Sequence, residues 1–300
     1  MGRGGQRATI DRRFLLLAAV ALSVSGALRA GELDAPEVEA ALARLRERLG
    51  PGGRLGVTAW DGGERRIDFD SHGRYAMCST FKLPLVAAIL AGAELERWLL
   101  ADEIAFDEDD LLDHAPTVRA NIERGRMTIE ALCAAAMLVS DNSAANLLIA
   151  RLGGPRELTV FLRRCGDRIG RLDRIEPDLN TNLPGDARDT TTPGSMVALM
   201  WTLLFGEVLG RASRLRLVSW MARSTTGRDR LRAGLPRDWR AGDKTGTGEN
   251  GAYNDIAFAL TARRVPIVIA CYATGGDATV DERAEIHAEV GRIVARVFEA

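Results

Sequence analysis

The sequence predicts an α/β fold of the α+β type, with one antiparallel sheet built from both chain ends and flanked by the terminal helices, plus an all-helical lobe. Strand patterns occupy residues 54–69 and return from residue 243, whereas residues 79–221 are mostly helical and rich in Ala and Leu. Because strands must pair somewhere, the simplest assembly joins both ends in one sheet. The groove between two such lobes is the expected place for an active site.

These patterns predict how the chain is divided. We expect an export signal in residues 1–30, a discontinuous α/β domain in residues 31–70 and 223–300, and a helical domain in residues 71–222. With 300 residues, of which 46% are hydrophobic, the chain can bury a substantial core.

Local signals support the elements in order. Asp34 is a good helix N-cap and Gly50 a good stop, which predicts a helix between them. Residues 61–63 read Asp-Gly-Gly between two apolar runs, which is a hairpin signal. Residues 281–300 predict a closing helix.

The first thirty residues have the order of an export signal. Arg12 and Arg13 precede the apolar residues 14–22, which are too few to span a bilayer, and small residues follow. We expect cleavage near Ala27 or Ala30, by the Sec or the twin-arginine route. The mature protein would be periplasmic or secreted, without stable membrane association; a retained N-terminal anchor is the alternative.

Composition narrows the choice of partners. The chain has 40 basic and 41 acidic residues, so no basic field points to nucleic acid or to an anionic membrane. No oligomerisation signal is present, and we expect a monomer. Cys133, Cys165 and Cys271 lie in apolar surroundings and Cys78 directly precedes Ser79, so we expect free thiols.

A serine and a lysine define the first chemical motif. Only two of the basic residues are lysines, Lys82 and Lys244, and lysine, unlike arginine, can lose its proton or act as a compact point charge. Lys82 follows Ser79 by three residues, and Pro84 requires a helix to begin near Ser79. The amine then lies beside the hydroxyl and can activate it as a nucleophile. Unpaired N–H groups at the helix start could stabilise an oxyanion.

The second motif is Ser140-Asp141-Asn142, between two apolar helical segments. A serine hydroxyl can pass a proton to a leaving nitrogen, and an asparagine amide can hold a substrate carbonyl or the lysine. The triplet is equally a good N-cap for the helix that follows, and taken alone capping is the simpler interpretation.

The third motif is a long irregular loop in residues 174–193, rich in Pro, Asp, Asn and Thr. Such loops are usually functional or disordered. Arg174 and Asp189 could pair at its neck. Inside it, Glu176 and Asn180 could hold one water between them, with Glu176 as the general base. A solvated surface loop is the alternative.

The fourth motif, Asp243 to Thr247, is strand-like and contains the second lysine. The Lys244 ammonium, flanked by hydroxyls, suits a carboxylate. Gly246 lets another backbone approach closely, and the Thr247 N–H could be a second oxyanion donor.

In this order, Ser-x-x-Lys, Ser-Asp-Asn, Glu-Pro-x-x-Asn and Lys-Thr-Gly resemble the motif set of class A serine β-lactamases, from about Asp34 to the chain end. The resemblance implies hydrolysis of the β-lactam amide bond of penicillins and cephalosporins, giving antibiotic resistance. It implies small-molecule β-lactam substrates and neither a metal nor an organic cofactor.

The resemblance also implies a catalytic role for each motif. Ser79 would attack the lactam carbonyl, and Lys82, or Glu176 through a water, would accept its proton; both candidates for this base stay open. Ser140 would pass a proton to the lactam nitrogen. Glu176 with Asn180 would activate the water that releases the acyl group.

Other residues would bind the substrate. The backbone N–H groups of Ser79 and Thr247 would form the oxyanion hole. Where other members have an arginine on the later strand, this chain has Tyr253 and Asn254, and Arg230 matches the position that some members use instead. Position 248 is Gly, so Cys78 lacks the disulfide partner of one carbapenem-hydrolysing branch. The implied substrate-binding set is Asn142, Lys244, Thr245, Gly246, Thr247 and Arg230.

Two related classes share the serine and the lysine. A penicillin-binding DD-peptidase acts on cell-wall peptides, and a β-lactam sensor acylates and stays acylated. Neither would be expected to carry the Glu176 loop, because that loop serves deacylation by water. The motif set therefore favours a hydrolase.

Overall fold

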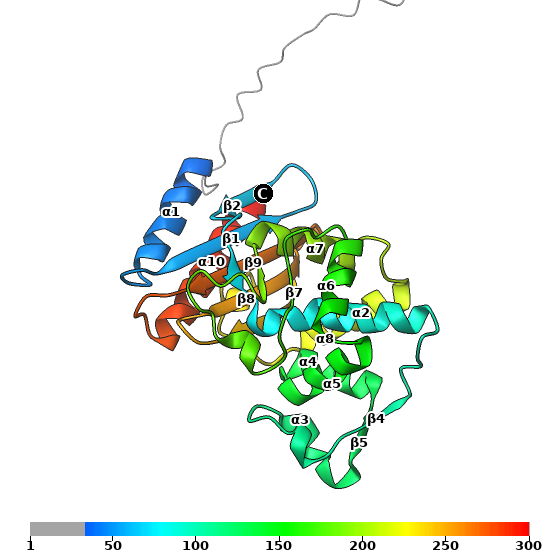
Figure 1. Ribbon diagram of the computed structural model, residues 1–300. Helices are drawn as coiled ribbons and strands as arrows, with labels where there is room; N and C mark the ends of the chain where they lie inside the picture. Colours follow the sequence, from blue (N-terminus) through cyan, green and yellow to red (C-terminus); the bar gives the residue numbers. More distant parts are fainter. Residues whose placement is uncertain (1–33, 300) are drawn as a thin grey trace, which may run out of the picture. The chain divides into compact units, whose positions relative to one another are not determined.

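The computed structural model describes residues 34–299, so the predicted export signal at residues 1–30 lies outside the described residues. Its centre is a five-stranded sheet with the order β2-β1-β9-β8-β7, in which every neighbouring pair is antiparallel (Figure 1). The predicted fold class is confirmed, because the strands come from both ends of the chain. They are β1 (Arg54–Trp60), β2 (Arg66–Phe69), β7 (Arg240–Thr247), β8 (Tyr253–Leu260) and β9 (Pro266–Thr274).

Helices occupy most of the rest of the described chain. The first and last are α1 (Ala35–Glu47) and α10 (Val280–Phe298), and between them lie α2 (Lys82–Glu94), α3 (Pro116–Ala120), α4 (Ile129–Leu138), α5 (Asn142–Leu152), α6 (Pro155–Arg164), α7 (Pro193–Leu204), α8 (Arg211–Arg223) and α9 (Leu231–Gly234). Short strands pair as β3 (Tyr75–Ala76) with β6 (Thr190–Thr191) and as β4 (Glu103–Ala105) with β5 (Arg126–Thr128). Single 3₁₀ turns are η1 (Cys78–Phe81), η2 (Glu108–Asp110), η3 (Ile122–Arg124) and η4 (Asp178–Asn180).

The sheet is buried on both faces, and strand β9 shows this directly. Successive side chains of a strand point to opposite faces. Ile267 and Ile269 belong to one hydrophobic cluster with residues of α1 and α10, whereas Val268 and Ala270 belong to another with residues of α2, α4, α5 and α7. The apolar run of β9 is therefore continuous instead of alternating, because each face packs against helices.

The terminal helices cover one face of the sheet, as predicted (Figure 1). Helix α1 begins with a capping box: the Glu37 N–H donates to the Asp34 carboxylate at 2.9 Å, and the Asp34 N–H donates to the Glu37 carboxylate at 3.1 Å. Two of the donors orphaned at the start of the helix are thereby satisfied.

Helix α2 is the central helix of residues 82–223, which we call the helical region. Its ten buried residues lie on all sides, since Lys82 to Leu90 are buried without a break. A helix that is apolar all round belongs in a core. Helices α4, α5, α6 and α8 pack against it, and Lys82 of the predicted nucleophile motif is its first residue.

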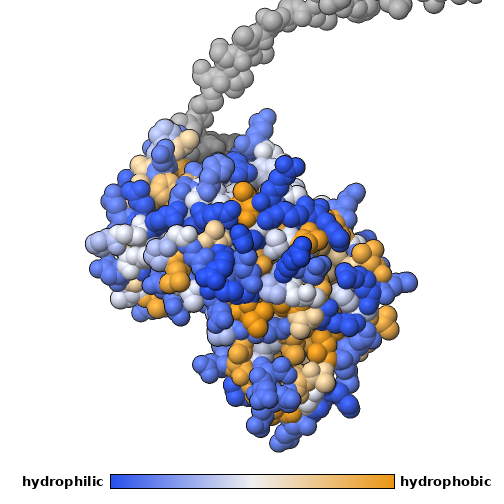
Figure 2. Space-filling model, viewed as in Figure 1, coloured by the Kyte–Doolittle hydropathy of each residue, from blue (hydrophilic) through white to orange (hydrophobic). Residues whose placement is uncertain are grey.

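Figure 2 shows hydrophobic surface residues gathered over the helical region, below the sheet. None of the described helices has the length and apolar character needed to cross a membrane. The division into domains at residues 71 and 222 stays a prediction.

Helix α9 and helix α10 approach each other so closely that Gly234 has no room for a side chain. An added Cβ would overlap the backbone carbonyl oxygen of Ala288. We expect Gly234→Ala to lower the free energy of unfolding by about 1–3 kcal/mol, because overpacking forces the backbone to shift. Urea unfolding measures this. Gly63→Ala is the matched control, since its Cβ would meet nothing nearer than 3.4 Å; equal losses in both variants would contradict the prediction.

Candidate active site

Ser79 and Lys82 lie side by side at the junction of η1 and α2. Ser79 stands on the 3₁₀ turn and Lys82 is the first residue of α2, with Pro84 in the first helical turn. The Lys82 Nζ donates to Ser79 Oγ at 2.8 Å, so the neighbourhood predicted from the three-residue spacing is confirmed. A serine next to a buried amine is the arrangement of an activated nucleophile.

The Lys82 amine is fully buried among oxygen atoms. Burial lowers the pKa of Lys82 from its usual value, and the nearby Glu176 carboxylate opposes this shift. An ammonium has three hydrogens, so it cannot donate to all five of the oxygens around Nζ at once. The acceptors around Nζ are Ser79 Oγ at 2.8 Å, Ser140 O at 2.9 Å, Ser140 Oγ at 3.3 Å, Asn142 Oδ1 at 2.5 Å and Glu176 Oε1 at 3.0 Å.

The Ser-Asp-Asn triplet both caps a helix and contacts Lys82. Asp141 is the N-cap of α5, where its carboxylate accepts the Ala144 N–H at 2.9 Å. Its neighbours Ser140 and Asn142 both contact Lys82. Capping by the middle residue therefore fixes the two flanking side chains beside the lysine.

Ser140 lies between the two lysines. Its Oγ is 3.3 Å from Lys82 Nζ and 3.0 Å from Lys244 Nζ. Its backbone has a φ of 59°, a left-handed conformation that is uncommon for a residue with a side chain. When both lysines donate, the two lone pairs of the hydroxyl are used, and its proton is available for a third group. Ser140 is thus placed to pass on a proton.

The long loop is closed at its neck by the predicted ion pair. Arg174 Nε lies 2.6 Å from Asp189 Oδ2, and the Asp189 carboxylate also accepts the N–H groups of Asp173 and Arg174. Inside this loop, Glu176 Oε1 is 3.3 Å from Ser79 Oγ, and the Asn180 side chain donates to Glu176 Oε2. The loop therefore brings an acid and an amide to the serine.

One residue of the site was missed by the sequence analysis. The Asn146 side chain donates to the Glu176 carbonyl at 2.8 Å and accepts the Glu176 N–H at 2.9 Å. The spacing of Asn146 could have indicated it, because it lies four residues after Asn142, on the same face of α5. Asn146 thus anchors the backbone of Glu176 to the helical region.

Strand β7 brings the second lysine to the same place. Lys244 is fully buried, which strongly lowers its pKa, and the charge of Lys82 lowers it further. Next to it, the Thr245 hydroxyl lies 2.7 Å from that of Thr226, a second residue absent from the predicted set. A lysine with adjacent hydroxyls is suited to bind a carboxylate.

Gly246 allows β7 to approach η1. A Cβ at Gly246 would lie 2.7 Å from the Met77 carbonyl oxygen and 3.2 Å from the Ser79 nitrogen. Such distances exclude any larger residue, as the sequence analysis expected. The close approach also sets the backbone of Thr247, the next residue of β7, near that of Ser79.

Arg230 lies behind β7 and is almost wholly buried. Its guanidinium donates to the carbonyls of Gly246 at 3.1 Å and Asn254 at 2.7 Å, and to Thr247 Oγ1 at 2.9 Å. It also stacks on the Tyr253 ring, with Cζ 3.6 Å from the ring centroid. Arg230 therefore orients the Thr247 hydroxyl and braces the strand.

The cysteines of the described chain carry no disulfide, and Cys78, Cys133 and Cys271 are buried. Burial raises the pKa of the Cys78 thiol to about 12, so it stays protonated beside the nucleophile. A Cβ at Gly248 would lie 2.7 Å from Cys78 Sγ, which locates position 248 as the neighbour of this thiol. Within residues 34–299, no cluster of three or more His, Cys, Asp or Glu side chains could hold a metal ion.

The predicted residues thus meet from four separate parts of the chain. The arrangement contains a serine hydroxyl, an adjacent amine, a carboxylate within reach of that hydroxyl, a second hydroxyl between two amines, and a strand backbone close to that of Ser79. Acyl transfer through a serine followed by hydrolysis is the chemistry that such a set can perform.

Comparison with solved structures defines the class. The structure resembles an ancestral class A β-lactamase (GNCA), with a TM-score of 0.84 and 48% sequence identity over 87% of this chain and 100% of that one. It also resembles the class A β-lactamase of the last common ancestor of Gram-negative bacteria (GNCA4), with a TM-score of 0.85 and 49% identity over 87% of this chain and 99% of that one. The fold is that of a class A β-lactamase.

Sequence comparison leads to the same family. The family model of the beta-lactamase enzyme family matches residues 37–298. The chain is 40% identical to beta-lactamase CTX-M-8 of Citrobacter amalonaticus over 87% of its length and 89% of that protein. It is 44% identical to beta-lactamase L2 of Stenotrophomonas maltophilia over 82% of each. The chain belongs to the beta-lactamase enzyme family and is a class A β-lactamase, a hydrolase of β-lactams.

Removing the side-chain amide of Asn146 should loosen the loop that holds Glu176. We expect Asn146→Ala to lower the free energy of unfolding by about 1–3 kcal/mol, because it breaks two hydrogen bonds to one backbone residue. Amide hydrogen exchange in residues 174–189 should accelerate. In the control Asn121→Ala, which loses one bond to Thr117 within a helical turn, exchange in that loop should not change. Equal exchange in both variants would refute the anchoring role.

Proposed function

We propose that this chain hydrolyses penicillins and cephalosporins through an acyl-enzyme on Ser79, which a water activated by Glu176 then releases. One observation carries the proposal. The Lys82 amine lies 2.8 Å from Ser79 Oγ and 3.0 Å from Glu176 Oε1, in a site where both ionisable side chains are fully buried. Nucleophile and both potential bases are therefore in contact.

In the acylation step, Ser79 Oγ bonds to the lactam carbonyl carbon and gives up its proton. Lys82 and Glu176 both lie within 3.3 Å of this oxygen, so the geometry supports either as the acceptor. The negative charge that develops on the carbonyl oxygen would be held by the N–H groups of Ser79 and Thr247. The carbon–nitrogen bond of the ring then breaks.

The leaving nitrogen needs a proton, and Ser140 is the proposed source. Its hydroxyl would donate to the nitrogen and be replenished from Lys82, which is 3.3 Å away. Lys244, at 3.0 Å from the same hydroxyl, keeps the lone pairs of Ser140 occupied and its proton directed elsewhere. Two amines on one hydroxyl thus make it a donor.

Deacylation is assigned to Glu176 and Asn180. The Asn180 amide contacts one carboxylate oxygen of Glu176, while the other oxygen faces Ser79. A water between Glu176 and the acyl carbon would lose its proton to the carboxylate and attack the ester. Its hydroxyl forms the new acid, the bond between the acyl carbon and Ser79 Oγ breaks, and the proton taken by Glu176 returns to Ser79 Oγ.

Substrate binding is assigned to the opposite wall of the site. Lys244 and Thr245 would hold the substrate carboxylate, with Thr247 oriented by Arg230 as a further donor. Asn142 would contact the side-chain amide of the substrate. Gly246 would leave room for the protein backbone at Met77 and Ser79. These are charge-assisted contacts, which orient as well as bind.

The alternatives were a DD-peptidase and a sensor that stays acylated. Both are disfavoured by the Glu176 carboxylate, held 3.3 Å from the nucleophile by a braced loop. We also propose that the chain is exported to the periplasm or beyond, because an arginine-led apolar segment lies in residues 1–30. We further propose that it acts as a monomer. Hydrolysis there would give antibiotic resistance.

Intact-protein mass with benzylpenicillin tests the reaction sequence. The parent should turn over without accumulating adduct, Glu176→Ala should accumulate an acyl-enzyme, and Ser79→Ala should form none. The loss of the general base should slow release by at least about 100-fold. Ser219→Ala, which removes an exposed hydroxyl, is the control and should behave as the parent. A parent that acylates once and stops would show a penicillin-binding enzyme or sensor.

Arg230→Ala should raise KM for benzylpenicillin about tenfold, because the Thr247 hydroxyl loses the donor that orients it. Arg228→Ala, an exposed arginine two residues earlier, should leave KM unchanged. Steady-state hydrolysis measures both, with circular dichroism to check folding. An unchanged KM in well-folded Arg230→Ala would remove Arg230 from the binding set.

A further inference from the structure

A second cavity, distinct from the catalytic site, lies on the outer side of the loop that carries Glu176. Its volume is about 590 Å³, within the range of small-molecule sites. It is bounded by loop residues 182–188, by the start of β1 and by the turn that follows β9. None of the residues that we assign to catalysis lines it.

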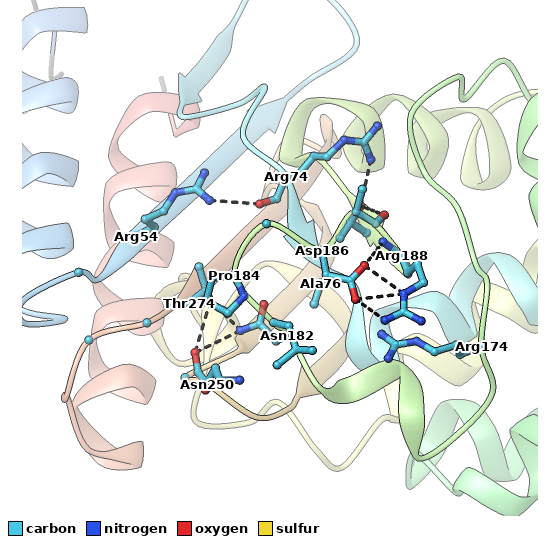
Figure 3. Close-up of a pocket in the computed structure, with 18 residues that line it drawn as sticks. Arg54, Arg74, Ala76, Arg174, Asn182, Pro184, Asp186, Arg188, Asn250 and Thr274 are labelled. Carbon is cyan, nitrogen blue, oxygen red and sulfur yellow. Dashed lines mark hydrogen bonds and ion pairs between the residues drawn. The ribbon is translucent and has the colours of Figure 1, made fainter.

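The charge of the lining is strongly one-sided. Its charged residues are four arginines and a single acid, Asp186. In Figure 3, Arg54 lies to the left of the cavity, Arg174 and Arg188 to the right, and Asn182 between them. Guanidinium groups that surround one space favour an anion there, because they donate in pairs to carboxylate and phosphate oxygens.

Three of these arginines already have carboxylate partners. Arg54 pairs with Asp70 at 2.7 Å, and Arg174 pairs with Asp189 at 2.6 Å. Arg188 pairs with Asp186 at 2.7 Å. Arginines whose charge is balanced by a carboxylate can still orient an anion, but their charge does not require a further anion.

Arg74 differs from the other three. Its guanidinium donates to Thr190 Oγ1 at 2.9 Å and to the Ile169 carbonyl at 3.4 Å, and both acceptors are neutral. In the described part of the chain, no carboxylate forms an ion pair with it. Around the cavity, four arginines therefore face three carboxylates, which leaves one positive charge for a ligand to balance.

The lining also has an apolar part. Ala76, Leu183, Pro184 and Ala187 face the cavity, and Leu183 is about half exposed, at 49%. Removing a large hydrophobic side chain from water is favourable, so a ligand that covers Leu183 would gain binding free energy. We propose that the cavity binds a small organic anion, with a carboxylate or phosphate head at the arginines and an apolar body against this side.

Such a ligand would hold the loop against the sheet. Asn182 already donates to Thr274 Oγ1 at 2.7 Å, and Asn250 donates to the Thr181 carbonyl at 2.9 Å. An anion shared by Arg188 on the loop and Arg74 outside it would add a third tie. Any effect on hydrolysis rests on the role proposed for Glu176, whereas the binding itself does not.

Calorimetric titration of the whole parent protein with phenyl phosphate tests the site. We expect binding that weakens with salt, at least about tenfold weaker binding by Arg74→Gln, and intermediate binding by Arg74→Lys, which keeps the charge but loses the paired donors. Arg263→Gln, which removes an exposed arginine far from the lining, is the control. Amide exchange of residues 182–188 should slow when the ligand binds.

The penicilloate formed by hydrolysis of benzylpenicillin, a dicarboxylate, is titrated in parallel. Binding of at least one of the two anions through Arg74 would support the site. Their relative affinities would show whether it prefers a phosphate or a carboxylate. If neither binds at about 10 mM, or if Arg74→Gln binds as tightly as the parent, the proposal is overturned. Failure of Glu176→Ala to trap an acyl-enzyme would leave this result untouched, so the two proposals fail separately.

Discussion

The buried ion pair between Lys82 and Glu176 is the interaction on which the rest of the structure depends. Both side chains are inaccessible to solvent, and their charged atoms lie 3.0 Å apart. Burying two such charges carries a large desolvation cost, and removal of either partner would leave the other unpaired. The surrounding elements can be understood as the means of holding these two groups together next to Ser79.

Each partner is positioned by a different part of the molecule. Lys82 is rigid because α2 is apolar on every side and lies inside the helical region. Glu176 is on an irregular loop, so its position needs separate supports: the Arg174–Asp189 ion pair at the neck and the two bonds from Asn146. A rigid helix and a braced loop thus meet at one carboxylate.

Strand β7 of the sheet contributes a second buried lysine, Lys244, and a close contact with η1 at Gly246. Burial and the charge of Lys82 lower the pKa of Lys244, while Ser140 bridges the two amines. Gly246 lets β7 come close to the backbone of Met77 and Ser79. Arg230 stabilises this strand from behind. The outer side of the same loop forms the arginine-lined cavity, so one segment lies between two distinct surfaces.

The sequence by itself determined the fold class, the motif set and the Ser79–Lys82 neighbourhood, because these follow from apolar periodicity and from spacing within one helical turn. It also predicted the Arg174–Asp189 pair. Tertiary structure alone decided how Ser140 bridges two lysines, that Asn146 anchors Glu176, and that Arg230 donates to the Thr247 hydroxyl. These contacts join residues from 17 to 104 positions apart. No local pattern encodes such distances, since only the packing of helices, loop and sheet brings the groups together.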